Sequence, residues 1–155
     1  MQKHGVKKYS KNFKPKEFYR GYQNFTNSHS DPVIDYRLAM LCEVVLEKVY
    51  KKTKIEIFRG YLTTPVDEGF NTFENNTQHQ NGEAVDIKLP KNHKNELKKL
   101  YVWMLSNCVF DQLIFHTAGK DCWIHVSYTI RRNLRMEYGT NRDGKIVGKT
   151  KRLKR

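Results

Sequence analysis

The chain is short of acidic residues and of cysteine, and each shortage narrows what the protein can be. Sixteen aspartates and glutamates stand against 29 lysines and arginines, so the formal net charge is +13. Such a field attracts polyanions, including nucleic acid and anionic wall polymers, without specifying which one. The three cysteines, Cys42, Cys108 and Cys122, are an odd number without close spacing. This argues against a disulfide framework and favours a reducing compartment.

Long apolar runs and internal repeats are also missing. No run approaches the roughly 20 residues that a membrane-spanning helix needs, so we expect no membrane span. Residues 1–16 lack the apolar stretch of a secretory signal, so we expect synthesis in the cytoplasm without a signal peptide. No zinc-finger spacing or RNA-recognition sequence is present, which leaves a nucleic-acid-binding module supported by charge alone.

Composition divides the 155 residues into three segments. Residues 1–30 alternate aromatic, polar and basic side chains, which predicts an arm with aromatic anchors. Residues 31–130 carry the regular hydrophobic patterns and are expected to form the folded domain. Residues 131–155 are a basic tail, in which 141–144 has the composition of a turn and suggests a small terminal hairpin.

The hydrophobic patterns predict two helices and four strands. A helix is expected over 31–51, because Asp31 suits the N-cap, Pro32 suits the first turn and apolar residues recur at helical spacing. A second helix is expected over 92–108. Strands are expected over 55–59, 83–87, 110–115 and 123–128. This order predicts an α+β domain with helices on one face of a mostly antiparallel sheet.

One pattern carries chemistry: His79-x-x-Gly82-x-Ala84-x-Asp86, followed by His125 on a later strand. Two histidines and one carboxylate are the ligands of many catalytic zinc sites, which leave a further position for water. The turn at Gly82 lets a loop ligand and a strand ligand converge, and the small Ala84 leaves room beside Asp86. The sequence therefore predicts Zn²⁺ held by His79, Asp86 and His125.

The same motifs also point to a resemblance with a known protein family. Together with Phe110-Asp111-Gln112-Leu113-Ile114, Trp123-Ile124-His125-Val126-Ser127-Tyr128 and Arg59-Gly60-Tyr61, they resemble the zinc D-alanyl-D-alanine carboxypeptidases, in particular their small phage-encoded branch. The resemblance covers about residues 13–130. It implies the fold shared with VanX-type dipeptidases and the hedgehog signalling domain, and a peptidoglycan stem peptide as substrate. It also implies substrate-binding roles for Tyr61, Gln78 and Trp123.

Two positions depart from the family pattern. The arginine expected after Gly60-Tyr61 is Leu62, which cannot bind a substrate carboxylate. A glutamate general base is absent at both places where the family carries one, which are Cys122 and His116 here. Either Asp121 or His116 can replace it, and His116 can instead be a fourth zinc ligand or a packed histidine without a catalytic role. Cys122 can be a thiolate ligand or a packed residue.

Two functions follow as hypotheses. The first is an active zinc peptidase of the endolysin type, delivered to the bacterial cell wall and held there by its basic ends. The second is a catalytically impaired zinc-binding component of a phage virion on the same scaffold. In that case the N-terminal arm and the basic tail would contact other virion proteins.

Overall fold

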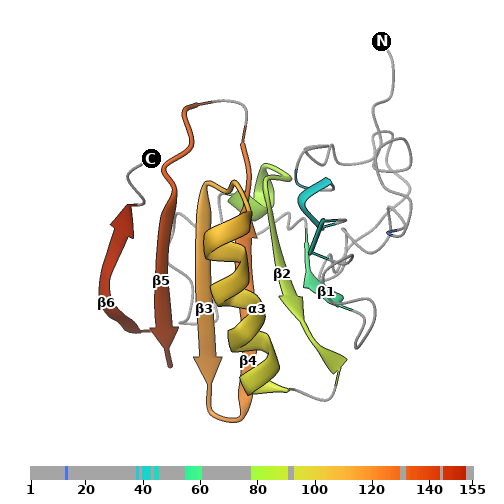
Figure 1. Ribbon diagram of the computed structural model, residues 1–155, viewed down its shortest axis with the longest axis vertical. Coiled ribbons are helices and arrows are strands. Elements are labelled where there is room, and N and C mark those ends of the chain that lie inside the picture. Colours follow the sequence, from blue (N-terminus) through green and yellow to red (C-terminus); the bar gives the residue numbers. More distant parts are fainter. Residues whose placement is uncertain are drawn as a thin grey trace.

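The computed structural model describes residues 13, 38, 40–42, 44–45, 55–60, 78–90, 93–129, 132–143 and 145–152. These residues form a six-stranded sheet and a helix that crosses it (Figure 1). The strands are β1 (Glu56–Arg59), β2 (Ala84–Lys88), β3 (Gln112–Ala118), β4 (Asp121–Ser127), β5 (Glu137–Arg142) and β6 (Lys145–Arg152), and the helix is α3 (Lys94–Asn107).

The sheet has the order β1-β2-β4-β3-β5-β6. Four of its five neighbouring pairs are antiparallel, and β3 with β5 is the parallel pair. The expectation of an α+β fold with a mostly antiparallel sheet is confirmed. Likeness to the hedgehog and D-alanyl-D-alanine peptidase fold stays a prediction.

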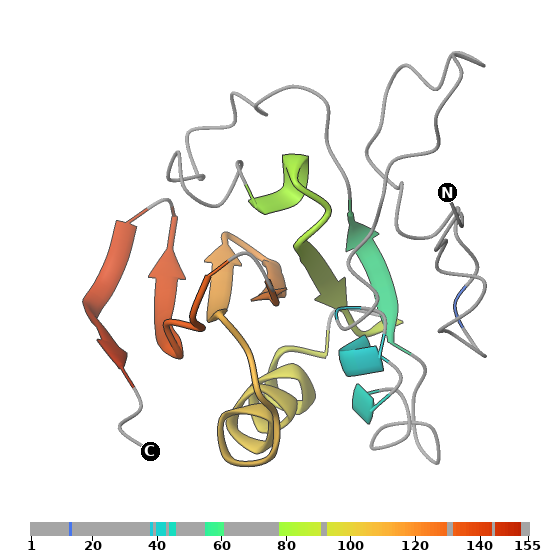
Figure 2. The ribbon, with the colours of Figure 1, turned by 90° about the horizontal axis from the view of Figure 1, so that it is seen from above.

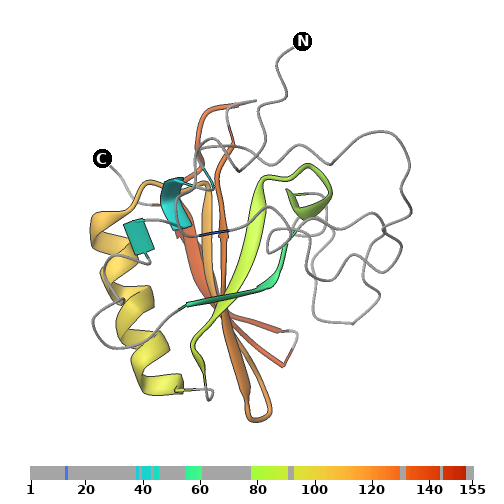
Figure 3. The same ribbon diagram turned by 90° about the vertical axis from the view of Figure 1, so that its right-hand side faces the viewer.

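Helix α3 covers one face of the sheet. Its buried residues recur at the helical spacing of one face: Leu97, Leu100, Tyr101 and Met104. They join a core with strand residues such as Ile87, Phe115 and Ile124. Figures 2 and 3 show α3 and the short helical pieces between residues 38 and 45 on the same side of the sheet.

The helix predicted over 31–51 is confirmed where the structure describes it. Residues 38, 40–42, 44 and 45 are helical, and the rest of that range lies outside the described residues. The buried and exposed positions alternate with helical periodicity: Leu38, Leu41, Cys42 and Val45 are buried, whereas Met40 and Val44 are exposed. Phe13, from the aromatic segment, is also buried in this core.

Strand alternation gives the sheet two chemically different faces. Successive side chains point to opposite faces, and partners in register share a face. Val85, Ile87 and Ile124 belong to the core under α3. Asp86 and His125, which are partners in register on β2 and β4, therefore point to the opposite face.

The end of the chain extends the sheet. The hairpin predicted near 141–144 is confirmed, because β5 and β6 pair antiparallel on either side of Asp143, which has a φ of 49°. The division into arm, domain and tail stays a prediction, although these two strands belong to the same sheet as β1 to β4. Across the described helices, none has the length and apolar character needed to span a bilayer.

Two predicted strands are shifted in the structure. The strand expected over 110–115 is Gln112–Ala118, and the one expected over 123–128 is Asp121–Ser127. Both strands extend toward their shared turn, where Gly119 has a φ of +56° and allows a two-residue hairpin loop.

Candidate metal centre

Three predicted ligands meet on the sheet face opposite α3. His79, Asp86 and His125 each offer one ligand atom, and these atoms all lie within 4.8 Å of one another. All three side chains are buried. Asp86 and His125 are neighbours on β2 and β4, whereas His79 comes from a helical turn at residues 78–80. The group could hold a metal ion.

The turn after His79 explains the spacing of the motif. The amide of Gly82 donates to the carbonyl of His79 at 3.1 Å, and the amide of Glu83 donates to that of Gln78 at 2.9 Å. With Gly82 at a φ of 69°, this is the Schellman ending of a helical turn. The turn reverses the chain into β2, and so places Asp86 beside His79, as the sequence predicts.

The ring of His79 is held at one nitrogen. Its Nδ1 lies 2.8 Å from the carbonyl oxygen of Gly60, which follows β1. A carbonyl only accepts, so Nδ1 carries the hydrogen and donates it. In a neutral ring, the lone pair is then on Nε2, which lies 3.3 Å from Oδ1 of Asp86.

The ring of His125 is held in the same way at its other nitrogen. Its Nε2 lies 3.2 Å from Oε1 of Gln78, and its Nδ1 lies 2.9 Å from Oδ1 of Asp86. The amide oxygen of Gln78 only accepts, so Nε2 carries the hydrogen. In a neutral ring, the lone pair of His125 is on Nδ1 and points at Asp86.

With neutral histidine rings, these contacts suit a bound cation. With neutral rings, two nitrogen lone pairs and a carboxylate oxygen face one another without a hydrogen between them, which is repulsive in a buried site. A divalent cation removes the repulsion. Zinc bonds of roughly 2.0–2.1 Å at tetrahedral angles separate ligand atoms by about 3.3 Å. The two histidine nitrogens lie 3.3 Å and 2.9 Å from Oδ1 of Asp86, and all the ligand atoms lie within 4.8 Å of one another, so an ion could be bound after small shifts of the side chains.

Asp86 supplies the negative charge of the group. Burial by itself raises the pKa of this carboxyl. When the two rings are protonated in the absence of an ion, their charges and hydrogen bonds outweigh burial and hold the pKa of Asp86 well below its usual value. Asp86 is therefore ionised at neutral pH, in the form that binds a metal.

His116 and Trp123 lie next to the group on the same face. They are partners in register on β3 and β4, both are buried, and their rings stack at 5.0 Å with an interplanar angle of 5°. The ring centre of His116 is 6.3 Å from that of His125. His116 does not belong to the group of ligand atoms within 4.8 Å, so the geometry does not favour a fourth ligand.

The structure does not bring Asp121 to the group of His79, Asp86 and His125, which is called the metal group below. Asp121 begins β4, four residues before His125, a separation of roughly 13 Å along a strand. Its side chain is 58% exposed and lies 3.8 Å from the ammonium of Lys88. The strand direction explains the outcome: Asp121 shares a face with His125, but Trp123 lies between them.

Cys122 is packed in the apolar core on the other face of β4. Burial raises the pKa of its thiol, which opposes the thiolate form that a metal would need. Of the alternatives for Cys122, the structure favours the packed residue. Tyr61 and Leu62 lie outside the described residues.

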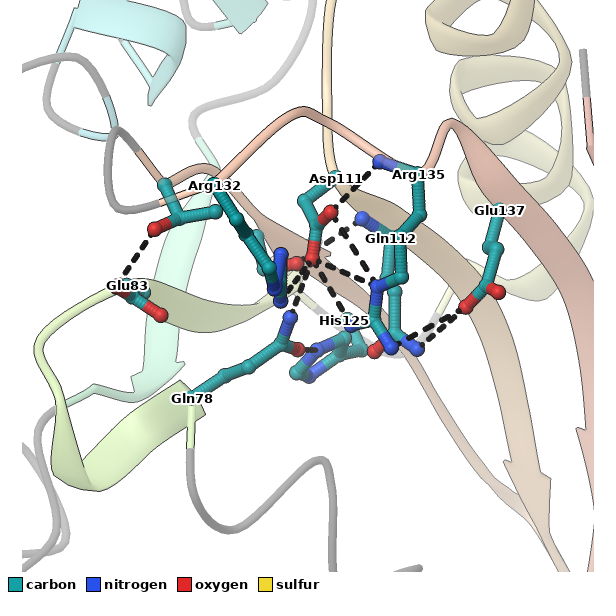
Figure 4. A network of polar contacts seen from close by, with 10 residues as sticks. Gln78, Glu83, Asp111, Gln112, His125, Arg132, Arg135 and Glu137 are labelled. Atoms are coloured by element: carbon teal, nitrogen blue, oxygen red, sulfur yellow. Dashed lines mark hydrogen bonds and ion pairs between the residues drawn. The ribbon is translucent and has the colours of Figure 1, made fainter.

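Asp111 anchors a polar network that the sequence analysis missed as part of the site (Figure 4). Its side chain is fully buried and accepts hydrogen bonds from Gln78, Arg132 and Arg135. Arg135 donates from its backbone amide and its guanidinium, and it also lies 3.5 Å from Glu137. The available signal was a charged residue, Asp111, within a predicted strand that is otherwise mostly apolar.

Gln78 lies between Asp111 and His125 (Figure 4). Its Nε2 donates to Oδ2 of Asp111 at 2.7 Å, while its Oε1 faces His125. Because the amide is buried and both of its ends contact protein groups, the geometry favours support of His125 over the predicted contact with substrate.

Comparisons of the chain with protein-family models, with curated proteins and with solved structures found no match.

Proposed function

We propose that this protein is a zinc-dependent peptidase that hydrolyses peptidoglycan stem peptides or cross-links, as a D-alanyl-D-alanine carboxypeptidase or endopeptidase. The observation that carries the proposal is the buried group of His79, Asp86 and His125 with its converging ligand atoms. The substrate class is supported by the resemblance of the motifs around these residues to that family. Zinc is supported by the nitrogen and oxygen donors and by their spacing.

A zinc ion at this group would supply a Lewis acid that polarises a peptide carbonyl and lowers the pKa of a water molecule to about 7. The protein itself would hold the three ligand side chains in place and shield them from bulk water. Asp86 stays ionised, Gly60 holds the ring of His79, and Gln78 holds the ring of His125. Burial excludes bulk water, which strengthens every electrostatic contact in the group.

We assign the proton transfers to His116. Its ring lies beside that of His125, while Asp121 is distant along β4. A ring nitrogen of His116 would accept the proton of the attacking water and return it to the leaving amine, a role for which histidine is suited near neutral pH. The stacked ring of Trp123 fixes the plane of His116.

Trp123 and Tyr61 remain the proposed substrate-binding residues. The ammonium of Lys88 lies 5.9 Å from the centre of the Trp123 ring, so the indole is held between a cation and an imidazole. One edge of this stack borders the metal group through His116, where a peptide next to the scissile bond would lie.

The test is hydrolysis of purified peptidoglycan by the zinc-loaded full chain, followed by identification of the released peptides. We expect His125→Ala to abolish activity. His116→Gln should lower kcat by about 10²–10⁴-fold, the usual contribution of general acid–base catalysis, while zinc content is kept. Asp121→Asn is the matched control and should stay within about twofold of wild type, because a charge at that separation from the group contributes little through a polar surface.

Failure of the zinc-loaded protein to cut any peptidoglycan would contradict the proposal. Equal losses in His116→Gln and Asp121→Asn would contradict the assignment of the proton transfers alone. The pH dependence of kcat should also change in His116→Gln and not in Asp121→Asn.

A second function is a metal-binding virion component without peptidase activity. One observation favours it: in the part of the chain that the structure describes, no second carboxylate joins the ligand group. The peptidase proposal includes delivery to the bacterial cell wall. The second proposal includes incorporation into a virion and contacts with other virion proteins. A chelator that lowers Tm in a protein that never hydrolyses peptidoglycan would support this second function over the first.

A further inference from the structure

A chain of hydrogen bonds, part-buried at its two arginines and buried from Asp111 onward, leads to the group of His79, Asp86 and His125 (Figure 4). Arg132 and Arg135 contact Asp111, Asp111 contacts Gln78, and Gln78 contacts His125. We propose that Gln78 is a positioning residue that selects Nδ1 of His125 as the nitrogen that binds metal. The inference rests on the proposed metal site and goes beyond it, because it names what orients one ligand.

The direction of the Gln78 amide is decided by Asp111. An ionised carboxylate only accepts hydrogen bonds, so the group that faces Oδ2 of Asp111 at 2.7 Å has to be the amide nitrogen. The amide oxygen is then the atom 3.2 Å from Nε2 of His125. A flipped amide would place two acceptors against each other at Asp111, and so it is excluded in this environment.

Asp111 is itself held from several sides. Its Oδ1 accepts the backbone amide of Arg135 at 2.8 Å, and its Oδ2 accepts Nη2 of Arg135 at 2.9 Å and Nη2 of Arg132 at 2.7 Å. Charge-assisted bonds of this kind are the strong ones, and this carboxylate is fully buried. The acceptor that orients Gln78 is therefore fixed.

The orientation of Gln78 determines the tautomer of His125. An acceptor facing Nε2 requires the hydrogen there, which leaves the lone pair on Nδ1, the nitrogen 2.9 Å from Asp86. The opposite tautomer would place a hydrogen on Nδ1, between the ring and Asp86, where it would exclude an ion. Partners of this type orient metal ligands, and their loss lowers metal affinity by about 10–100-fold.

The position of Gln78 in the sequence adds a second argument. Gln78 directly precedes the ligand His79 and belongs to the same Schellman-ended turn, since its carbonyl accepts the amide of Glu83 at 2.9 Å. One short turn thus supplies a ligand and the group that orients another ligand. A shift of the turn would move both at once.

The experiment uses the full chain labelled with ¹⁵N in histidine and compares wild type with Gln78→Leu. Zinc affinity is measured by competition with a chromogenic chelator, and long-range ¹H–¹⁵N spectra identify the metal-bound nitrogen of each ring. In wild type we expect Nδ1 of His125 and Nε2 of His79 to bind zinc. In Gln78→Leu we expect zinc affinity to fall by about 10–100-fold. We also expect the spectra of this variant to show zinc bound to His125 through either ring nitrogen, and no longer through Nδ1 alone.

Gln112→Leu is the matched control. Gln112 is another buried glutamine, on the same face of the sheet, and its amide contacts Glu137 at 3.0 Å. Its replacement should lower stability without changing zinc affinity or the metal-bound nitrogen. This comparison separates a positioning role from the general effect of removing a buried amide.

Asp111→Asn tests the step before Gln78. An asparagine can donate as well as accept, so it permits the Gln78 amide to flip and present its nitrogen to His125. We expect a mixture of His125 tautomers and weaker zinc binding. If this variant does not fold, the Gln78→Leu comparison still decides the proposal.

Wild-type affinity together with unchanged Nδ1 ligation in Gln78→Leu would overturn the inference and leave the proposed function intact. Zinc bound to wild type through Nε2 of His125 would also overturn it. A zinc-loaded protein that binds through Nδ1 but cuts no peptidoglycan would contradict the proposed function and support this inference.

Discussion

At the scale of single residues, every ring nitrogen of the two ligand histidines has an assigned partner. His79 uses Nδ1 and His125 uses Nε2 to contact protein acceptors, and each turns its remaining nitrogen to Asp86. The lone pairs that would bind an ion are thus prepared by hydrogen bonds on the far side of each ring. Histidines that bind metal usually donate their other ring N–H to a protein group in this way.

The cysteines give a prediction at the same scale. All three are free and buried, and burial raises the pKa of Cys108 to about 11 and also raises that of Cys122. The reactive thiolate is therefore scarce at pH 7. We expect negligible reaction of the native protein with a thiol reagent, and reaction of all the cysteines after unfolding in guanidinium. Rapid labelling of native Cys122 would contradict its packed position in the core.

At the scale of elements, the Schellman turn at residues 78–83 is the part of the site that a single substitution at Gly82 would disturb most. Gly82 has a φ of 69°, a region in which a side chain costs roughly 1–2 kcal/mol. We expect Gly82→Ala to lower the free energy of unfolding by about that amount and to weaken zinc binding, because the turn sets the approach of His79 to Asp86. Urea denaturation and chelator competition measure the two effects.

Gly119→Ala is the control for this prediction. Gly119 has a similar φ of +56°, and a Cβ added there meets nothing within 4 Å. It lies in the turn between β3 and β4, away from the ligands. Its loss of stability should match that of Gly82→Ala while zinc affinity stays unchanged. Equal affinity in both variants would mean that the Gly82 turn does not position His79.

The hydroxyl of Tyr101 joins helix α3 to the sheet, and its pKa is raised in the folded protein. Burial raises the pKa of Tyr101 to about 12 from an ordinary value near 10, and the hydroxyl donates to the carbonyl of Gly139 on β5 at 2.9 Å. Between those pH values the unfolded chain has lost this proton and the folded chain keeps it. The contribution to stability is complete below pH 10 and is lost as pH rises through the folded pKa.

We therefore expect Tyr101→Phe to change the alkaline limb of the stability curve. A shift of two pKa units corresponds to about 2.7 kcal/mol, an upper value for a buried group. The variant should be about 1 kcal/mol less stable at pH 7, where it lacks one hydrogen bond, and should lose less stability between pH 10 and 12. Parallel curves for the two proteins in urea unfolding would contradict this account of Tyr101.

At the scale of the whole molecule, the apolar core and the polar site lie on opposite faces of the sheet. The α3 face carries the apolar core, while the other face carries the metal group, the His116–Trp123 stack and the Asp111 network. Both faces depend on the same strands, because Asp86 alternates with Val85 and Ile87 along β2. Loss of a bound metal should therefore lower the stability of the sheet as well as the proposed activity.

Much of this arrangement could be predicted from the sequence, for physical reasons. Helix α3 has a clear helical period, and the ligands were marked by a long ordered motif whose Gly82 requires a turn. The Asp111 network could not be predicted, because Asp111 and Arg135 are 24 residues apart and no periodicity relates them. The parallel pairing of β3 with β5 could not be predicted, because no pattern in the sequence relates residues 112–117 to residues 137–142.

The most direct test of the account is metal content and metal-dependent stability of the purified full chain. We predict about one zinc ion per chain, a Tm that falls by several degrees on chelation, and loss of both properties in His79→Ala and His125→Ala. A zinc-free protein that takes up no added metal, with a Tm unchanged by chelators, would contradict the central claim.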